Sequence, residues 1–369
     1  MKYYIIAGEA SGDLHGANLI KAILKKDPKA QIRCWGGDAM ASEGGKLVKH
    51  YKELAFMGFI EVLFNLKTIL NNIKFCKKDI VDFQPDAIIF IDYPGFNMRI
   101  AKWAKALNYP VHYYISPQIW AWKENRIHKI KRDVDHMYVI LPFEKQFYED
   151  KHDYKVHFVG HPLIDAISNR AEVNESEFRK TFQLSEKPII ALLPGSRKQE
   201  ITTMLETMLE VSKRFTAYQF VIAGAPSQSS EFYKQLIGNH DVTLINNRTY
   251  DLLEVAHAAL VTSGTATLET GLFKVPQVVC YKANAISYAI AKRVIKIKYI
   301  SLVNLIMDRL VVTELIQDDF NITQLEQELT KILEPSQREH IAQEYSLLEE
   351  QLGSTGASQR TAELIVDSL

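Results

Sequence analysis

The sequence has no excess of charge and no long apolar run, and each absence excludes a class of protein. Its 44 basic and 44 acidic residues cancel. A chain without a net field does not hold nucleic acid, so any anionic ligand must be bound by a local cluster. The longest apolar stretch covers 55–60 and resumes after Glu61 at 62–64. It is well short of the ~20 residues that a membrane-spanning helix needs. We therefore expect neither nucleic-acid binding nor a membrane span.

Cysteine is scarce, and its spacing excludes a disulfide scaffold and a thiolate metal site. Cys34, Cys76 and Cys280 stand far apart in apolar surroundings, without metal-ligand or C-x-x-C spacing. They are typical of buried thiols in a reducing compartment. The chain opens on a strand-like run with no basic leader, apolar signal segment or cleavage site in front of it. We therefore expect a cytoplasmic location.

What the sequence does contain is a repeated alternation of short apolar runs and amphipathic helical stretches. This alternation is typical of parallel β-sheets covered by helices, an α/β fold. The length of 369 residues exceeds the size at which one hydrophobic core stops growing. We expect two Rossmann-like, doubly wound domains that face a central cleft, because ligands of such sheets bind at the carboxyl ends of the strands.

The alternation also suggests where the domains begin and end. Strands are expected over 3–7, 31–34, 87–92, 111–116, 137–141 and 156–159, and again over 189–193, 219–223, 242–245, 259–262 and 277–281. Between the two sets, around 169–188, the pattern becomes polar and irregular. We expect an N-terminal domain over 1–168 and a C-terminal domain over 187–345, with a helical, polar segment at the end of the chain.

Each half opens with a strand that runs into a glycine turn and then a helix. In the first half, Gly8, Gly12 and Gly16 have four-residue spacing, which is neither the GxGxxG fingerprint nor a Walker A loop. Missing side chains there would let a ligand approach backbone N–H groups at a helix start, with Gly12 as the candidate contact. A close-packed turn without a ligand explains the same spacing.

In the second half, the turn is Gly195, Ser196 and Arg197. A glycine turn followed by a hydroxyl and a guanidinium at a helix start predicts a diphosphate clamp. Backbone N–H groups and the positive helix end favour an anion, and Arg197 can offer two parallel donors. The alternative is an N-capped helix with an exposed arginine.

A third turn of this kind contains Ser263, Gly264 and Thr265. The hydroxyls suit a second phosphate contact, and Glu269, one turn into the expected helix, could accept hydrogen bonds from both hydroxyls of a ribose. A capping box that includes Thr265 and Glu269 is the structural alternative.

Asp92 is the candidate general base. It ends an expected strand and precedes a Pro-Gly turn, which places a carboxylate at the ligand-binding edge of the sheet. A turn or N-cap role would explain it equally. His15 and His161 lie at similar strand ends and are rival bases, or buried structural histidines.

No metal site or cofactor is expected. Asp133-Val134-Asp135 has the form of an acidic pair that can hold a metal ion on a diphosphate, but two carboxylates are too few to define a site. The pair also precedes an expected strand, at its amino end.

Aromatic and basic residues gather in two further places. Trp120 and Trp122 precede Arg126, His128, Lys129, Lys131 and Arg132, a combination that suits a sugar phosphate. The apolar segment 56–64 could touch lipid tails, and the basic residues Lys292, Arg293, Lys296 and Lys298 could lie against anionic lipid heads. Core packing and a solvated amphipathic helix are the ordinary explanations.

Seven segments together resemble the lipid-A-disaccharide synthase family, in the family's order and over nearly the whole chain. They are Gly-Glu-Ala-Ser-Gly-Asp at 8–13, Met-Gly-Phe-Ile-Glu-Val at 57–62, Ile-Asp-Tyr-Pro-Gly-Phe-Asn at 91–97, Ser-Pro-Gln-Ile-Trp-Ala-Trp at 116–122, Leu-Pro-Phe-Glu at 141–144, Leu-Pro-Gly-Ser-Arg at 193–197 and Ser-Gly-Thr-Ala-Thr-Leu-Glu at 263–269. The segment 301–306 also resembles the family's late motif.

The resemblance implies a GT-B fold that holds a nucleotide mainly in its second domain, with a last helix over 346–369 that returns to the N-terminal domain. It implies that UDP-2,3-diacylglucosamine donates its sugar, with inversion, to 2,3-diacylglucosamine 1-phosphate (lipid X), giving UDP and a β-1,6-linked lipid A disaccharide 1-phosphate. It implies peripheral attachment to the cytoplasmic face of the inner membrane. The family's roles fall on Asp92 and Arg197 as residues needed for activity, and on Glu269 and Asn304 as nucleotide contacts.

One departure and two alternatives stay open. Many family members have a second acidic residue where Gly95 stands here, which puts a shared-base scheme in doubt. A UDP-sugar epimerase of the same architecture would need no acceptor, and a nucleotide-sugar sensor would need no catalytic base. The oligomeric state is also open, a homodimer included.

Overall fold

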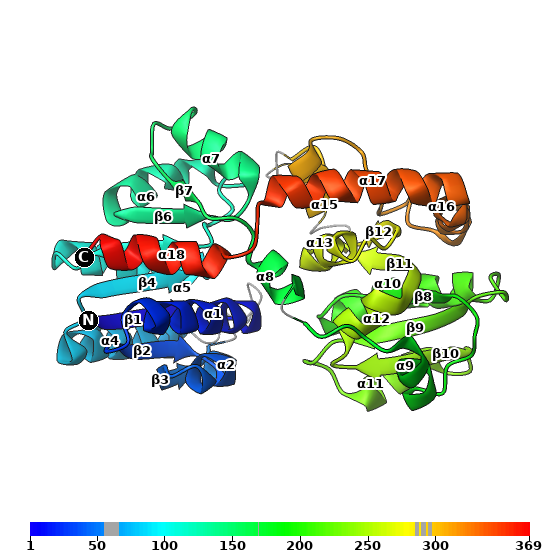
Figure 1. The fold of residues 1–369 in the computed structure, drawn as a ribbon, viewed down its shortest axis with the longest axis horizontal. Helices are drawn as coiled ribbons and strands as arrows, with labels where there is room; N and C mark the ends of the chain where they lie inside the picture. The colour runs from blue at the N-terminus through cyan, green and yellow to red at the C-terminus, as the bar shows by residue number, and fades with distance from the viewer. Residues whose placement is uncertain (55–65, 169, 285–287, 289–292, 294–296) are drawn as a thin grey trace. The chain divides into compact units, whose positions relative to one another are not determined.

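The chain folds into two compact units, each built on a parallel β-sheet. The computed structural model describes residues 1–369 except 55–65, 169, 285–287, 289–292 and 294–296. Unit 1 comprises Met1–Asp165 together with Leu352–Leu369, and unit 2 comprises Ala166–Gln351 (Figure 1). The predicted α/β class with two parallel sheets is confirmed.

Unit 1 contains a seven-stranded sheet in the order β3-β2-β1-β4-β5-β6-β7. Its elements are β1 (Lys2–Ala7), α1 (Ala10–Lys26), β2 (Gln31–Gly36), α2 (Asp38–Ser42), β3 (Lys46–His50), η1 (Tyr51–Glu53), α4 (Leu66–Phe83), β4 (Ala87–Ile91), α5 (Pro94–Ala106), β5 (Val111–Tyr114), η2 (Glu124–Arg126), α6 (Ile127–Asp133), β6 (His136–Val139), α7 (Pro142–Glu149), β7 (His157–Phe158), α8 (Pro162–Ser168), which crosses the division at 165, and α18 (Ala357–Asp367). The strand order reverses between β1 and β4, so this is the sheet's topological switch point.

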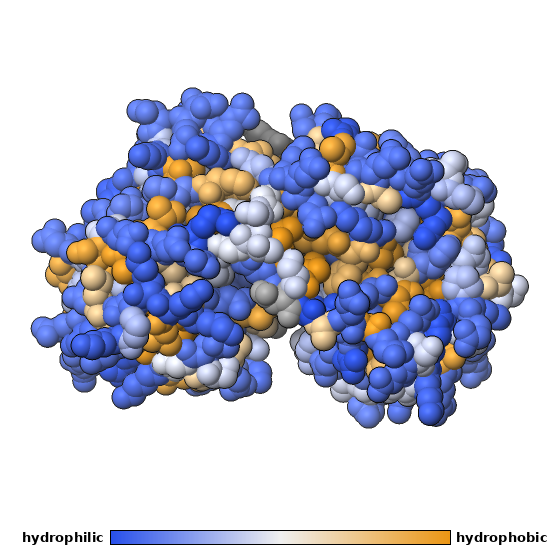
Figure 2. Space-filling model, viewed as in Figure 1, coloured by the Kyte–Doolittle hydropathy of each residue, from blue (hydrophilic) through white to orange (hydrophobic). Residues whose placement is uncertain are grey.

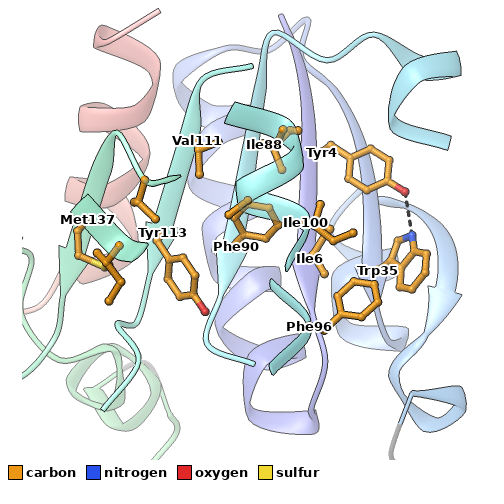
Figure 3. Packing of buried hydrophobic residues seen from close by; sticks show 14 of the residues in the cluster. Tyr4, Ile6, Trp35, Ile88, Phe90, Phe96, Ile100, Val111, Tyr113 and Met137 are labelled. Carbon is orange, nitrogen blue, oxygen red and sulfur yellow. Dashed lines mark hydrogen bonds between the residues drawn. The ribbon is translucent and has the colours of Figure 1, made fainter. Parts of the chain in front are cut away.

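The core of unit 1 explains why its central strands are apolar throughout. β4 is buried at all five positions, as expected for a parallel strand covered on both faces. Figure 3 shows Ile6, Phe90, Ile100 and Tyr113 packed between the sheet and α5. The indole N–H of the buried Trp35 donates a hydrogen bond to the Tyr4 hydroxyl, with 2.8 Å between the nitrogen and the oxygen. The polar atoms of these two core residues are therefore hydrogen-bonded to each other.

Unit 2 contains a six-stranded sheet in the order β10-β9-β8-β11-β12-β13. Its elements are α9 (Glu175–Thr181), β8 (Ile189–Leu193), α10 (Lys198–Ser212), β9 (Gln219–Gly224), α11 (Ser230–Ile237), β10 (Val242–Asn246), α12 (Thr249–Val255), β11 (Ala256–Thr262), α13 (Thr265–Leu272), β12 (Gln277–Tyr281), α15 (Leu302–Met307), β13 (Glu314–Ile316), α16 (Ile322–Leu333) and α17 (Pro335–Leu352). Here the order reverses between β8 and β11. Both strands are almost wholly buried.

The end of the chain returns to unit 1. α18 packs along α1 (Figure 1). Arg360 on α18 donates through Nε to the carbonyl of Val159, 2.9 Å away, and Lys26 pairs with Asp367 at 3.0 Å. Residues 346–351 belong to α17 and unit 2, and the returning segment begins at Leu352.

Among the residues that the structure describes, no helix is both long enough and apolar enough to cross a bilayer. On the face shown in Figure 2, hydrophilic residues cover much of each unit, with smaller hydrophobic patches between them. Of the expected lipid-contacting residues, the segment 56–64 and both Lys292 and Lys296 lie outside the described residues.

Candidate active site

Asp92 lies at the switch point of unit 1, directly after β4 and beside the end of β1. A Cβ atom added at Gly8 would overlap the ring of Tyr93, so the glycine allows this ring to lie on the backbone that follows β1. The Tyr93 hydroxyl donates to the carbonyl of Leu54, 3.2 Å away. The glycine turn after β1 and the Asp-Tyr-Pro-Gly turn after β4 are therefore one packed structure.

The backbone at Asp92 adopts a conformation that non-glycine residues rarely adopt. Asp92 has φ of 43° and Tyr93 has φ of 48°, two successive left-handed residues. Such conformations cost on the order of 1–3 kcal/mol each and persist only where the surroundings enforce them. Here the Asp92 carbonyl accepts from the Tyr113 hydroxyl at 2.6 Å and from the Asn97 side-chain amide at 2.7 Å. These two donors fix the backbone from which the Asp92 carboxylate projects.

The carboxyl of Asp92 has an unusual pKa. It is raised from the ordinary 3.8 to about 6, mainly by burial and also by the negative charges of Glu9 and Glu144, while the N–H of Tyr93 opposes the rise. A carboxylate with a pKa near 6 can accept a proton at neutral pH more readily than an exposed aspartate.

Glu144 joins two of the motifs that the sequence singled out. It is buried on α7 and accepts from Ser116 Oγ at 2.5 Å and Trp120 Nε1 at 3.2 Å, both in the loop after β5. Its other oxygen accepts from the N–H groups of Ile140 and Leu141 at 3.2 and 2.9 Å. Burial raises the pKa of Glu144, and these donors lower it. Glu144 therefore anchors the tryptophan-bearing loop beside Asp92.

The two rival bases are deeply buried. Burial lowers the pKa of His15 to about 4, and burial together with His15 lowers that of His161 to about 3. His161 Nδ1 accepts from the N–H of Leu163 at 3.2 Å, at the start of α8. Both imidazoles are neutral at physiological pH, and neither has the exposure of a group that meets a substrate.

Gly12 has a packing role that the sequence did not reveal. A Cβ there would lie 3.1 Å from Ala7 Cβ and 3.9 Å from Ile91 Cγ2, so the first turn of α1 lies tightly against β1 and β4. Its neighbour Asp13 accepts from the N–H groups of Gly37 and Met40 at 2.6 and 3.1 Å. Gly12 is buried in this first turn, and its contact with a ligand stays a prediction.

In unit 2, the switch point holds a pocket of about 310 Å³. It collects six residues that the sequence had marked as binding candidates on two separate segments: Gly195, Ser196, Ser263, Gly264, Thr265 and Glu269. They meet because β8 and β11 are parallel neighbours whose carboxyl ends share one edge. Ala225, Pro226 and Thr249, which the sequence analysis missed, complete the wall.

The turn after β8 requires its glycine. Gly195 has φ of 105°, and a Cβ there would overlap the carboxylate of Glu200. Glu200, in the first turn of α10, also accepts from the N–H of Ser196 at 3.1 Å. Arg197 is the N-cap residue of α10 and follows the pocket residue Ser196 directly in sequence. Its side chain is exposed, and it does not line the pocket.

Glu269 reaches the pocket from α13. It accepts from the Tyr250 hydroxyl at 2.7 Å, and burial raises the pKa of its carboxyl while this hydrogen bond lowers it. α13 begins at Thr265 after the N-cap residue Gly264, which has no side chain to cap it, so the capping-box alternative does not describe this turn.

Asn304 is placed differently from the expectation. Its amide donates to the carbonyl of Val312 at 2.8 Å and to Glu314 at 2.9 Å. Its oxygen accepts from the N–H groups of Val311 and Val312 at 2.8 and 3.0 Å. Both donors and both lone pairs are used within the protein, so Asn304 fastens α15 to the segment before β13 and does not line the pocket.

The acidic pair at 133–135 lies before β6, at the sheet edge opposite Asp92. Arg132 donates to both oxygens of Asp133 at 2.6 and 2.7 Å, and Asp135 pairs with Lys105. Within the described part of the chain, no group of three or more His, Cys, Asp or Glu side chains could hold a metal ion.

Comparison with known proteins identifies the family. The family model described as lipid-A-disaccharide synthetase matches residues 3–367. The chain belongs to the lipid-A-disaccharide synthase family. It is 41% identical to the lipid-A-disaccharide synthase of Syntrophus aciditrophicus over 97% of this chain and 95% of that one. It is 38% identical to that of Geobacter metallireducens, over 99% and 96%. This lipid-A-disaccharide synthase is therefore a glycosyltransferase of lipid A biosynthesis.

Solved structures confirm the GT-B fold expected of a lipid-A-disaccharide synthase. A UDP-GlcNAc 2-epimerase from Neisseria meningitidis, bound to UDP-GlcNAc, matches over 100% of both chains with a TM-score of 0.69 and 15% identity. The kitacinnamycin glycosyltransferase matches over 100% and 99%, with a TM-score of 0.66 and 15% identity. At this identity the likeness concerns the fold alone. The family match decides against the epimerase and the sensor.

Proposed function

We propose that the enzyme transfers 2,3-diacylglucosamine from UDP-2,3-diacylglucosamine to the 6-hydroxyl of 2,3-diacylglucosamine 1-phosphate, with inversion and without a metal ion. The match to the family over 3–367 carries this proposal. The acceptor binds to unit 1 and the UDP moiety binds to unit 2. The product is the β-1,6-linked disaccharide 1-phosphate.

The reaction is a single displacement at the anomeric carbon. The acceptor's 6-oxygen forms a bond to this carbon as the bond to the β-phosphate oxygen of UDP breaks, and the leaving UDP takes the electron pair. Asp92 accepts the proton of the 6-hydroxyl. One displacement inverts the anomeric configuration, and the transition state resembles an oxocarbenium ion, as in glycoside hydrolysis.

Stabilisation of the departing diphosphate is assigned to the second unit. The backbone N–H group at Gly195, the start of α13 at Thr265, and the Arg197 guanidinium supply donors and positive charge where negative charge develops. The hydroxyls of Ser196, Ser263 and Thr265 add contacts. These groups take the part that a divalent cation has in other nucleotide-sugar enzymes.

We also propose that the enzyme works at the cytoplasmic face of the inner membrane, as a peripheral protein. Both substrates carry acyl chains, which remain in or near a bilayer. Trp122 is 41% exposed, and Lys123 Nζ lies 4.2 Å from its ring centroid. An exposed aromatic ring beside a cation is typical of side chains that lie at a lipid interface.

Incubation with both purified substrates tests the function. We expect release of UDP together with a disaccharide 1-phosphate whose new linkage is β by proton NMR, and the same rate in excess EDTA. Donor alone should give no epimer. Loss of activity in EDTA with recovery on adding manganese would refute the metal-free scheme, and an α linkage would refute the single displacement.

Glu269→Gln should weaken UDP binding by about tenfold. We expect the carboxylate to accept hydrogen bonds from both ribose hydroxyls, and a neutral amide oxygen accepts them less strongly. Calorimetric titration with UDP and with 2′-deoxy-UDP measures this directly. Wild type should prefer UDP, and the variant should lose most of that preference. An unchanged ratio of the affinities for UDP and 2′-deoxy-UDP would show that Glu269 does not bind the ribose hydroxyls.

A further inference from the structure

Unit 1 contains a second pocket, next to the Asp92 turn, whose chemistry differs from that of the nucleotide site. It has a volume of about 250 Å³ and lies between the start of α5 and the η2–α6 segment. Three cations line it, Arg99 from α5, Arg126 from η2 and Lys129 from α6. Met98, Pro117 and Ile130 supply an apolar wall.

The three cations are not neutralised by the protein. None of the residues lining the pocket is acidic. In the described part of the chain, no carboxylate forms an ion pair with Arg99, Arg126 or Lys129. Two other basic residues on the same helices are paired, Lys105 with Asp135 and Arg132 with Asp133. Like charges that converge without a counter-ion repel one another, and an anion bound between them removes that cost.

The pocket also has room for a ligand. Gly95 lines it, and a Cβ atom added at Gly95 would meet nothing within 4 Å. Gly95 lies in the first turn of α5, a helix of 13 residues, so the helix dipole adds to the positive potential of the side chains.

We propose that this pocket binds the phosphomonoester of the acceptor sugar and thereby directs the acceptor's 6-hydroxyl toward Asp92. The inference rests on the proposed function. Asp92 and Gly95 are three residues apart, so their Cα atoms are separated by at most about 11 Å. In a pyranose, C1 and C5 flank the ring oxygen, so a phosphate on C1 and a hydroxyl on C6 lie within one sugar of each other. One acceptor can therefore reach both groups.

The charge of the ligand also fits the site. A phosphomonoester carries about −1.5 to −2 charges at neutral pH and three strong acceptor oxygens, enough to engage three cationic side chains. The apolar wall suits the sugar's hydrophobic face or the start of an acyl chain. The acceptor's phosphate is thus a recognition group, held while the chemistry takes place at the other end of the sugar.

The test compares two acceptors in wild type and in the triple variant Arg99→Gln, Arg126→Gln, Lys129→Gln. One acceptor is 2,3-diacylglucosamine 1-phosphate, and the other is the methyl glycoside of 2,3-diacylglucosamine, which lacks the phosphate. We expect the triple variant to lose about tenfold to a hundredfold in kcat/KM for the phosphorylated acceptor. Its kcat/KM for the methyl glycoside and its KM for the donor should be unchanged.

Lys102→Gln is the matched control, because Lys102 is exposed on α5 and does not line the pocket. It removes one positive charge from α5, as Arg99→Gln does, and should preserve the preference for the phosphorylated acceptor. Lys102→Gln should unfold at the wild-type temperature, since exposed substitutions usually change stability little. The triple variant should unfold at the same temperature as wild type or higher, because it removes the mutual repulsion of the three cations.

Two results would overturn the inference while leaving the proposed function intact. The first is an active triple variant with an unchanged ratio of kcat/KM for the two acceptors. The second is an equal fall with both acceptors, together with lost binding to phosphatidylglycerol vesicles, which would assign the pocket to a lipid headgroup. A wild-type enzyme that formed no disaccharide from either acceptor would instead refute the proposed function, and the inference with it.

Discussion

Replacing Asp92 with asparagine is expected to lower kcat by roughly 10²–10⁴-fold while leaving UDP affinity unchanged, because only the acceptor's proton transfer depends on this carboxylate. Asparagine is the appropriate change. It has nearly the same shape, and among non-glycine residues it tolerates the left-handed backbone at φ of 43° well. The carbonyl contacts from Tyr113 and Asn97 should therefore survive. Single-turnover kinetics and UDP calorimetry on the same preparation measure the two effects.

The pH dependence of wild type should reflect the same carboxylate. With a pKa of about 6, Asp92 is ionised at neutral pH, and kcat/KM should fall about tenfold for each pH unit below 6. Stability should change in the opposite direction. The pKa of Asp92 is higher in the folded than in the unfolded protein, so the folded protein binds more protons between about pH 4 and 6. The free energy of unfolding should therefore decrease as the pH rises through this window and Asp92 ionises.

The effect of Asp92 on stability allows a loss of catalysis in the variant to be distinguished from a loss of folding. The rise in pKa from 3.8 to about 6 corresponds to roughly 3 kcal/mol of destabilisation at neutral pH, as an upper limit for a partly exposed side chain. Asp92→Asn removes the charge, so the variant should unfold at the same temperature as wild type or higher at about pH 8, even though it is inactive.

Asp86→Asn is the control for this substitution. Asp86 lies just before β4, at the amino end of the strand that Asp92 follows, and accepts from the N–H of Lys2 at 2.7 Å. The same chemical change there should leave the rate and its pH profile unaltered. Near-normal turnover by Asp92→Asn would remove Asp92 from the mechanism. The two buried histidines would then need a structural change to serve as bases.

The sequence revealed where the two candidate sites lie, but not how they are held. Apolar runs followed by glycine turns identified the carboxyl ends of β1, β4, β8 and β11, because the buried strands of a parallel sheet are apolar throughout. The left-handed pair at Asp92 and Tyr93 was not predictable. It is enforced by the Tyr113 hydroxyl, 21 residues away in sequence, and by the Tyr93 ring lying on Gly8.

Asn304 was expected to contact the nucleotide from the family resemblance alone, and the sequence did not predict the hydrogen bonds that its side chain makes within unit 2. Its hydrogen bonds go to the segment before β13 and to Glu314 within that strand. β13 has only three residues and only one of them is buried, so no apolar run identified it. The edge strand β3 was missed for a similar reason, because three of its five residues are polar and none of the five is buried. Edge strands are short and charged in many proteins, which hides them from periodicity.

Arg197→Ala is the second substitution with a large expected effect. It should weaken UDP binding by about tenfold to a hundredfold and lower kcat by about 10²–10³-fold, since a donor aimed at the leaving diphosphate contributes more as charge develops. Arg197 is the N-cap residue of α10, directly after the Gly195–Ser196 turn, so its guanidinium and the backbone N–H group of Gly195 can engage the same diphosphate. Arg197→Lys should recover only part of the affinity, because an ammonium cannot offer two parallel donors.

Arg214→Ala provides the matched control. Arg214 follows the opposite end of α10 and forms an exposed ion pair with Glu326, an interaction worth about 0–1 kcal/mol. Its loss should alter neither UDP affinity nor rate. The decisive comparison is between UDP and uridine, because the clamp acts only on the diphosphate. Arg197→Ala should reduce the affinity for UDP and leave that for uridine unchanged. An equal loss for both ligands would mean that Arg197 shapes the pocket, and an unchanged affinity for UDP would exclude it from the diphosphate clamp.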